Sequence, residues 1–236
     1  MLFRSRHSVA RGGHAGIGVD PLSRFGELPK ARPGVGEILG VVTGELTSSV
    51  DLYWLPLGAG GHSVRLNGRL FEAVVALREG RKRCDLYHSA LVVHLPEGRF
   101  VIEQGPAGPR DSGRGVVAEG SVGTRWAGRL RLFRYEVRCW SEGVIPDVAE
   151  AVDSPQRLTE DENFARRLVA LVPTAPTAVW GRDELRAGEM WNSNSVTSWL
   201  LESTGLATAS LAPPEGGRAP GWHAGLVVAH RTNVSE

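Results

Sequence analysis

Two stretches of this chain carry side chains that could do nucleophilic or acid–base chemistry. Ser193 belongs to the polar run Asn192-Ser193-Asn194-Ser195, which leads directly into an apolar periodic stretch. The free N–H groups and the dipole of a helix start favour negative charge, so a nucleophile or an oxyanion would be stabilised there. His88 opens an apolar run and could accept the proton of a serine hydroxyl. Both features also have a structural interpretation, because Asn and Ser are common N-caps and a histidine at a strand start can be a hydrogen-bonded core residue.

A helix is predicted to follow the polar run. Val196, Trp199, Leu200 and Ser203 fall at i, i+3, i+4 and i+7, so they would lie on one face of a helix that packs on a core. Gly205 follows where a left-handed C-terminal cap would end the helix. Ser193 is therefore expected within one residue of the helix N-terminus.

His88 is expected near the start of the first strand of a β-hairpin. The apolar run at residues 86–95 predicts the first strand, and residues 96–98 (Pro-Glu-Gly) predict a turn. Residues 99–104 predict the second, antiparallel strand. Both strands are apolar at nearly every position, which is typical of a hairpin covered on both faces. His94 shares the parity of His88, but six residues separate them by roughly 20 Å along a strand, so they cannot serve one site.

The other expected elements are less tied to the candidate chemistry. Strands are predicted at residues 38–42, 50–57, 130–140 and 225–229, and residues 70–78 could form a helix or a strand. A helix over residues 163–171 is predicted to begin at a capping box, with Thr159 as N-cap and Glu162 three residues on. The rest of the chain is expected to form connecting loops.

Composition and cysteine count narrow the function classes. The chain has 236 residues, 42% of them hydrophobic, and a formal net charge of +1, which offers no basic field for nucleic acid or an anionic membrane. Cys84 and Cys139 are the only two cysteines and have no metal-ligand spacing, so neither a zinc site nor a disulfide scaffold is expected. No signal peptide or transmembrane run is evident, so a cytoplasmic location is expected. No cofactor is expected for the candidate chemistry.

The chain is expected to divide into two parts. Residues 1–35 are rich in Gly and Pro and predict a flexible extension, and residues 36–236 predict a single domain. A Gly- and Arg-rich insertion at about 105–130 interrupts this domain. Its arginines could meet a carboxylate on a partner, or the segment could be a solvated surface loop. These arginines are Arg110, Arg114, Arg125 and Arg129.

The sequence resembles the PPPDE group of the circularly permuted papain-like fold, which is related to the NlpC-type cell-wall peptidases. Members carry a histidine at the start of a strand in a Tyr/Trp-His-Thr/Ser context, and later an Asn-Cys-Asn helix start. Residues 87–93 (Tyr-His-Ser-Ala-Leu-Val-Val) are similar to the first motif, and residues 192–198 (Asn-Ser-Asn-Ser-Val-Thr-Ser) to the second. The resemblance covers residues 48–106 and 185–206. It implies an α+β fold in which an antiparallel sheet packs against helices and the active-site helix faces the histidine strand.

One departure from the motif bears on activity. Ser193 stands where the family has its catalytic cysteine. A helix dipole contributes about 1 kcal/mol, which cannot ionise a serine hydroxyl as it helps ionise a thiol. Ser193 would need His88 as general base, with Glu103 or Gln104 on the returning strand to orient the imidazole. The resemblance further implies that the binding cleft is lined by Asn192, Asn194, Trp191 and Tyr87.

Three functions remain open from the sequence. One is a hydrolase or acyltransferase, peptidase- or deubiquitinase-like or acting on acyl groups, that uses Ser193 and His88. Another is an inactive member of the fold that binds a peptide- or protein-like partner in the same cleft. The third is a structural or assembly protein in which both motifs are coincidental.

Overall fold

The computed structural model describes residues 47–57, 80, 82, 84–108 and 113–233. These residues belong to one compact unit, Gly40–Glu236. The predicted extension at 1–35, the predicted elements at 38–42 and 70–78, and Arg110 lie outside the described residues.

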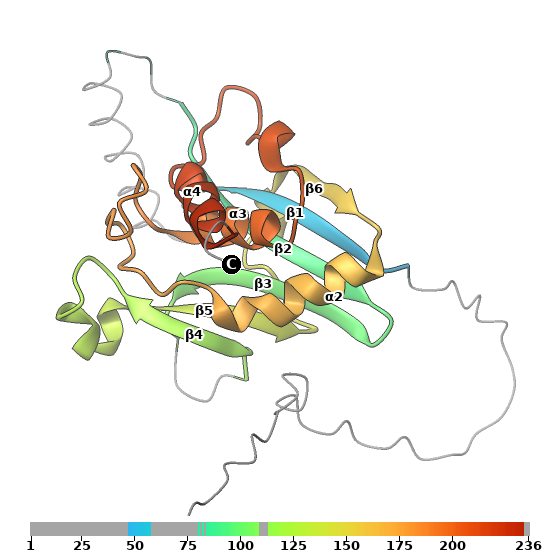
Figure 1. Cartoon of the computed structure of the whole chain (residues 1–236), viewed down its shortest axis with the longest axis horizontal. Coiled ribbons are helices and arrows are strands. Elements are labelled where there is room, and N and C mark those ends of the chain that lie inside the picture. Colours follow the sequence, from blue (N-terminus) through green and yellow to red (C-terminus); the bar gives the residue numbers. More distant parts are fainter. Residues whose placement is uncertain (1–46, 58–79, 81, 83, 109–112, 234–236) are drawn as a thin grey trace, which may run out of the picture. The chain divides into compact units, whose positions relative to one another are not determined.

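The described chain forms an α+β fold built on a six-stranded sheet in which every pair of neighbouring strands is antiparallel (Figure 1). The strand order is β4-β5-β3-β2-β1-β6. The bounds are Ser49–Pro56 for β1, Tyr87–Leu95 for β2, Gly98–Pro106 for β3, Val116–Ser121 for β4, Arg134–Ser141 for β5 and Val152–Thr159 for β6. The predicted strand at 50–57 and the hairpin at 86–104 are confirmed as β1 and as β2 with β3.

The two faces of the sheet carry separate apolar clusters because side chains alternate along each strand. On β2, Leu91, Val93 and Leu95 belong to the main core, which also contains residues of the helices. Ala90 and Val92 belong to a smaller cluster with Leu55, Val101 and Ile145. β2 is therefore covered on both faces, as its continuous apolar run predicts.

In the described part of the chain, three α-helices cover one face of the sheet (Figure 1). Their bounds are Glu162–Leu171 for α2, Ser193–Ser203 for α3 and Trp222–Asn233 for α4. Short 3₁₀ turns complete the described elements: η2 (Ala127–Arg129), η3 (Arg131–Phe133), η4 (Val148–Glu150), η5 (Val172–Thr174) and η6 (Thr208–Ser210). In the described part of the chain, no helix combines the length and apolar character needed to cross a lipid bilayer.

Two sequence predictions about helix ends and types are wrong. The N-cap of α2 is Asp161, whose carboxylate accepts from the N–H groups of Asn163 and Phe164, and not Thr159. Residues 225–229, predicted as a strand, lie within α4. The reason is tertiary packing: a Cβ on Gly225 would lie 2.2 Å from the carbonyl oxygen of Ser195, so this glycine lets α4 approach α3 closely.

The connection between β4 and β5 also differs from the sequence prediction. Residues 130–140 were expected to form one strand, but β5 begins only at Arg134. The preceding residues form η2 and η3, in which Leu130 N–H donates to the Ala127 carbonyl and Phe133 N–H donates to that of Leu130. A tightly wound double turn therefore replaces the first part of the predicted strand.

Candidate functional site

The start of α3 lies where the sequence predicts it, and its polar residues form an N-terminal cap. Ser193 is the first helical residue and Asn192 is the N-cap. The Asn192 side chain accepts from the backbone N–H groups of Asn194 (2.9 Å) and Ser195 (3.3 Å), while Asn192 N–H donates to the Ser195 hydroxyl at 3.1 Å. This reciprocal arrangement is a capping box, which satisfies helix N–H groups that would otherwise lack partners.

Asn194 joins the helix start to the sheet. Its side-chain oxygen accepts a hydrogen bond from the Ser89 hydroxyl at 2.9 Å. Its amide nitrogen donates to the carbonyl oxygens of Tyr87 (3.0 Å) and Pro220 (2.9 Å). Asn194 is 2% exposed, so its side chain is withdrawn from water, where an unpaired polar group is costly. We refer to Asn192, Asn194 and Ser195 as the α3 clamp.

The α3 clamp also holds the segment that leads into α4. The Ser195 hydroxyl donates to the Gly221 carbonyl at 2.8 Å, and Asn192 Nδ2 donates to the Pro220 carbonyl at the same distance. Gly221 has a φ of 84°, and a Cβ there would lie 2.6 Å from Asn192 Oδ1. Hydrogen bonding and close backbone approach at the helix start therefore fix α3 against the beginning of α4.

His88 does not face the start of α3. It alternates on β2 with Tyr87 and Ser89, which lie on the side of α3, and it pairs across the sheet with Leu55 of the opposite cluster. The Ser193 hydroxyl and the His88 imidazole are thus on opposite faces of the sheet. The catalytic pairing expected from the sequence is not formed in the structure.

The environment of His88 favours a neutral imidazole. Burial lowers its pKa from 6.5 to about 4, and the carboxylate of Asp147 opposes this shift. Asp147 is the N-cap residue of η4, and the neighbouring Ile145 packs on the same face of the sheet as Leu55. His88 is therefore a partly buried, uncharged side chain within the electrostatic influence of the Asp147 carboxylate.

The two residues expected to orient His88 lie on different faces of β3. Glu103 forms an ion pair with Arg138 at 2.6 Å, and Arg138 also pairs with the buried Glu136 at 3.0 Å. Glu103 is thereby part of a structural ion-pair network. Gln104 alternates with Glu103 and lies on the face of α3, where it is 6% exposed and neither amide atom has a partner among the described residues. The expected orientation of His88 by Glu103 or Gln104 is therefore not formed.

Tyr87 and Trp191 are core residues in this structure. Tyr87 is 7% exposed, its carbonyl accepts from Asn194, and a Cβ on Gly217 would lie 2.4 Å from its ring. Trp191 is 1% exposed and pairs with Trp180 through an isolated β-bridge. Tyr87 thereby supports the helix start, and Trp191 belongs to the core immediately before it. Cys139 is also buried in the core, as the sequence predicts, and burial raises the pKa of its thiol to about 12.

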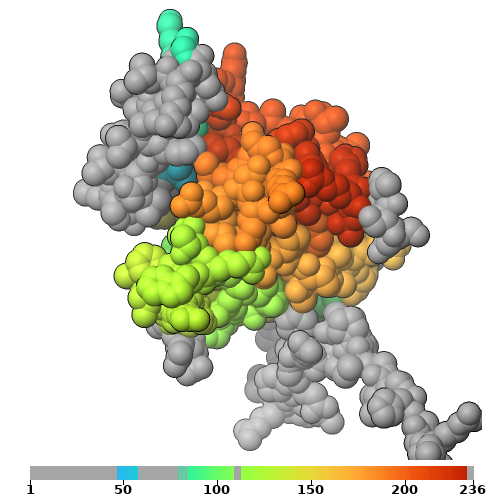
Figure 2. Space-filling view, turned by 60° about the vertical axis from the view of Figure 1, so that its left-hand side comes forward, coloured from blue at the N-terminus to red at the C-terminus, as the bar shows by residue number. Residues whose placement is uncertain are grey.

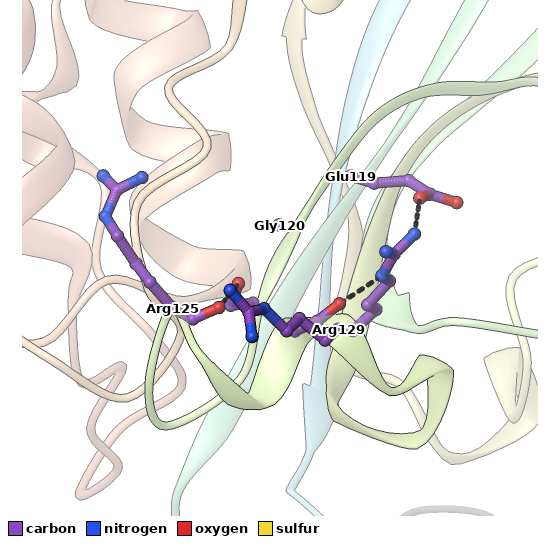
Figure 3. Close-up of a pocket in the computed structure, with 7 residues that line it drawn as sticks. Glu119, Gly120, Arg125 and Arg129 are labelled. Carbon is purple, nitrogen blue, oxygen red and sulfur yellow. Dashed lines mark hydrogen bonds and ion pairs between the residues drawn. The ribbon is translucent and has the colours of Figure 1, made fainter.

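Sequence reasoning did not identify a pocket of about 300 Å³ at the end of β4 (Figure 3). It is lined by Glu119, Gly120, Ser121, Arg125, Gly128, Arg129 and Arg134. Arg134 pairs with Glu119 at 3.1 Å and Arg125 pairs with Glu184, which lowers the pKa of the Glu184 carboxyl. The high density of arginine at 125–134 was the available signal, but the position of the pocket depends on the turns η2 and η3. In the described part of the chain, no group of three or more His, Cys, Asp and Glu side chains could hold a metal ion.

Comparison of this chain with protein-family models, with curated proteins and with solved structures finds no match. The interpretation of the site therefore depends on its own geometry.

Truncating the α3 clamp should be far more costly than truncating Ser193. Asn194→Ala removes three hydrogen bonds of a buried side chain and leaves Ser89 and the Tyr87 carbonyl without this partner, so we expect a loss of about 2–4 kcal/mol in the free energy of unfolding. Ser193→Ala should cost under about 1 kcal/mol, because the Ser193 hydroxyl is not part of the clamp. Urea denaturation of both variants measures the difference, and equal losses would contradict the clamp.

His88 should make the fold sensitive to acid. Its pKa is about 4 in the folded chain and 6.5 when the imidazole is exposed to water, so the unfolded chain binds more protons between these values. Stability is then full above pH 6.5 and falls as the pH drops toward 4, by about 1–3 kcal/mol. His88→Gln should flatten this part of the stability–pH curve. Parallel curves for His88→Gln and the unchanged chain would contradict the assignment.

Proposed function

We propose that this chain is a catalytically inactive, papain-like module that binds a peptide- or protein-like partner. The observation that carries the absence of catalysis is the position of His88 on the face of the sheet opposite α3, which separates Ser193 from the general base that a serine nucleophile needs. The papain-like fold and the peptide-like class of partner are inferred from the resemblance of residues 48–106 and 185–206 to the PPPDE group.

The hydrogen bonds made by the polar residues at the start of α3 support this proposal. A catalytic helix start offers its N–H groups to an oxyanion. Here the N–H groups of Asn194 and Ser195 are already bonded to the Asn192 side chain. The same residues that resemble a nucleophile motif therefore serve to attach the helix to β2 and to the segment before α4.

A rearrangement that created the dyad would be costly. Shifting β2 by one residue would turn His88 toward α3, but it would also turn every other β2 side chain to the opposite face. Leu91 and Val93, both 0% exposed in the main core, would leave it. The serine-hydrolase alternative therefore requires disruption of the core that positions α3.

Covalent probes should not distinguish Ser193 from other buried serines. We expect no labelling of Ser193 by a fluorophosphonate or an activated acyl ester under conditions that label a serine hydrolase completely, because His88 lies on the opposite face and cannot accept the hydroxyl proton. Mass spectrometry of the tryptic peptide that contains Ser193 provides the measurement. Stoichiometric labelling of Ser193 that is lost in His88→Ala would show that the chain is an active hydrolase and would overturn the proposal.

A further inference from the structure

The connection between β4 and β5 exposes an unusual set of large apolar side chains. Leu132 is 86% exposed, Trp126 73%, Leu130 59% and Phe133 41%. Residues 122–134 also carry four arginines and no acidic residue. We call this segment the 122–134 lobe, and Figure 2 shows this part of the chain (yellow-green) as a rounded projection of the surface.

Hydrogen bonds from side chains hold the backbone of the 122–134 lobe, while its large apolar side chains are exposed. The Arg134 guanidinium donates to the Gly128 carbonyl, and Ala127 N–H donates to the Thr124 hydroxyl. Gly128 is buried, and a Cβ there would lie 2.2 Å from the Ser121 hydroxyl. The backbone therefore packs against the end of β4, while Trp126 and Leu130 on either side of Gly128 remain in solvent. Such a preorganised surface loses little conformational entropy on binding.

We propose that the 122–134 lobe binds the surface of an anionic lipid bilayer, independently of the function proposed above. Exposed Trp and Leu side chains can enter the boundary between lipid headgroups and acyl chains, and flanking arginines attract acidic headgroups. The side chains of Trp126 and Leu132, 73% and 86% exposed, project from the surface and do not line a groove. A planar, deformable lipid layer can therefore accommodate them without a matching cavity. The formal net charge of +1 for the whole chain conceals this local concentration of arginine.

The ion pairs of the arginines in the 122–134 lobe determine which of its charges a ligand could meet. A symmetric contact with a second copy that placed Arg129 against its own equivalent would be repulsive. Arg125, Arg131 and Arg134 have the carboxylates Glu184, Glu136 and Glu119 as partners. Arg129 is exposed and has no ion pair with any described residue, so its full charge is available to a phosphate group.

Vesicle sedimentation with the full chain tests the proposal. We expect the protein to sediment with vesicles of equal parts phosphatidylcholine and phosphatidylglycerol, and far less with pure phosphatidylcholine. The double variant Leu130→Ser/Leu132→Ser should bind about tenfold more weakly or worse, because its apolar anchors are removed. Arg129→Gln should weaken binding about fivefold, and added salt should weaken it further.

Val144→Ser is the matched control, because Val144 is 60% exposed but lies outside the lobe. It should bind as the unchanged chain does, and circular dichroism and the urea midpoint should show that every variant is folded. Absence of sedimentation with anionic vesicles, or equal binding by Leu130→Ser/Leu132→Ser, would overturn the proposal. Binding of a polyglutamate peptide without binding of vesicles would also overturn it and would assign the lobe to an acidic protein.

Discussion

Asn194 provides the interaction on which the arrangement of α3 depends. Its buried side-chain amide forms hydrogen bonds with Ser89 and Tyr87 of β2 on one side and with Pro220 before α4 on the other. An asparagine can satisfy both partners at once because its side chain has an acceptor oxygen and two donor hydrogens. The helix start, the central strand and the C-terminal helix are therefore fixed together at one residue, and the apolar face of α3 packs around that point.

The same constraint explains why the helix start is structural in this chain. The Asn192 cap consumes N–H groups that could stabilise an oxyanion, and the hydroxyl of Ser195 is committed to Gly221. On the other side of the sheet, His88 is partly buried and feels the charge of Asp147, and Glu103 forms an ion pair with Arg138. The residues expected to form one catalytic centre are thus divided between two faces, each with a packing role of its own.

The sequence predicted local structure well wherever a local rule decides it. The Asn192 cap, the position of Ser193, the end of α3 at Gly205 and the β2–β3 hairpin all follow from caps, turns and periodicity. The face of His88 could not be predicted in this way. Alternation shows which side chains share a face, but β2 is apolar on both faces, so its sequence does not show which face the helices cover.

The two wrong predictions of secondary structure also come from tertiary contacts. The segment 225–229 has the aliphatic character of a short strand, yet Gly225 fits against α3 and the segment becomes helical. Residues 130–133 alternate as a strand would, but hydrogen bonds within η3 and from Arg134 to Gly128 turn them into the 122–134 lobe. In both cases long-range or side-chain contacts, which a periodic pattern does not contain, overrode an ambiguous local preference.

Two double-mutant cycles test the central claim most directly, because they report whether two side chains interact at all. For Ser89→Ala and Asn194→Ala, unfolding free energies should show a coupling of about 1 kcal/mol, the value of a buried hydrogen bond. For His88→Ala and Ser193→Ala, the effects should add to within about 0.5 kcal/mol, as expected for side chains on opposite faces of the sheet. A coupling above about 1 kcal/mol between His88 and Ser193, with none between Ser89 and Asn194, would place the imidazole beside the serine and contradict the account.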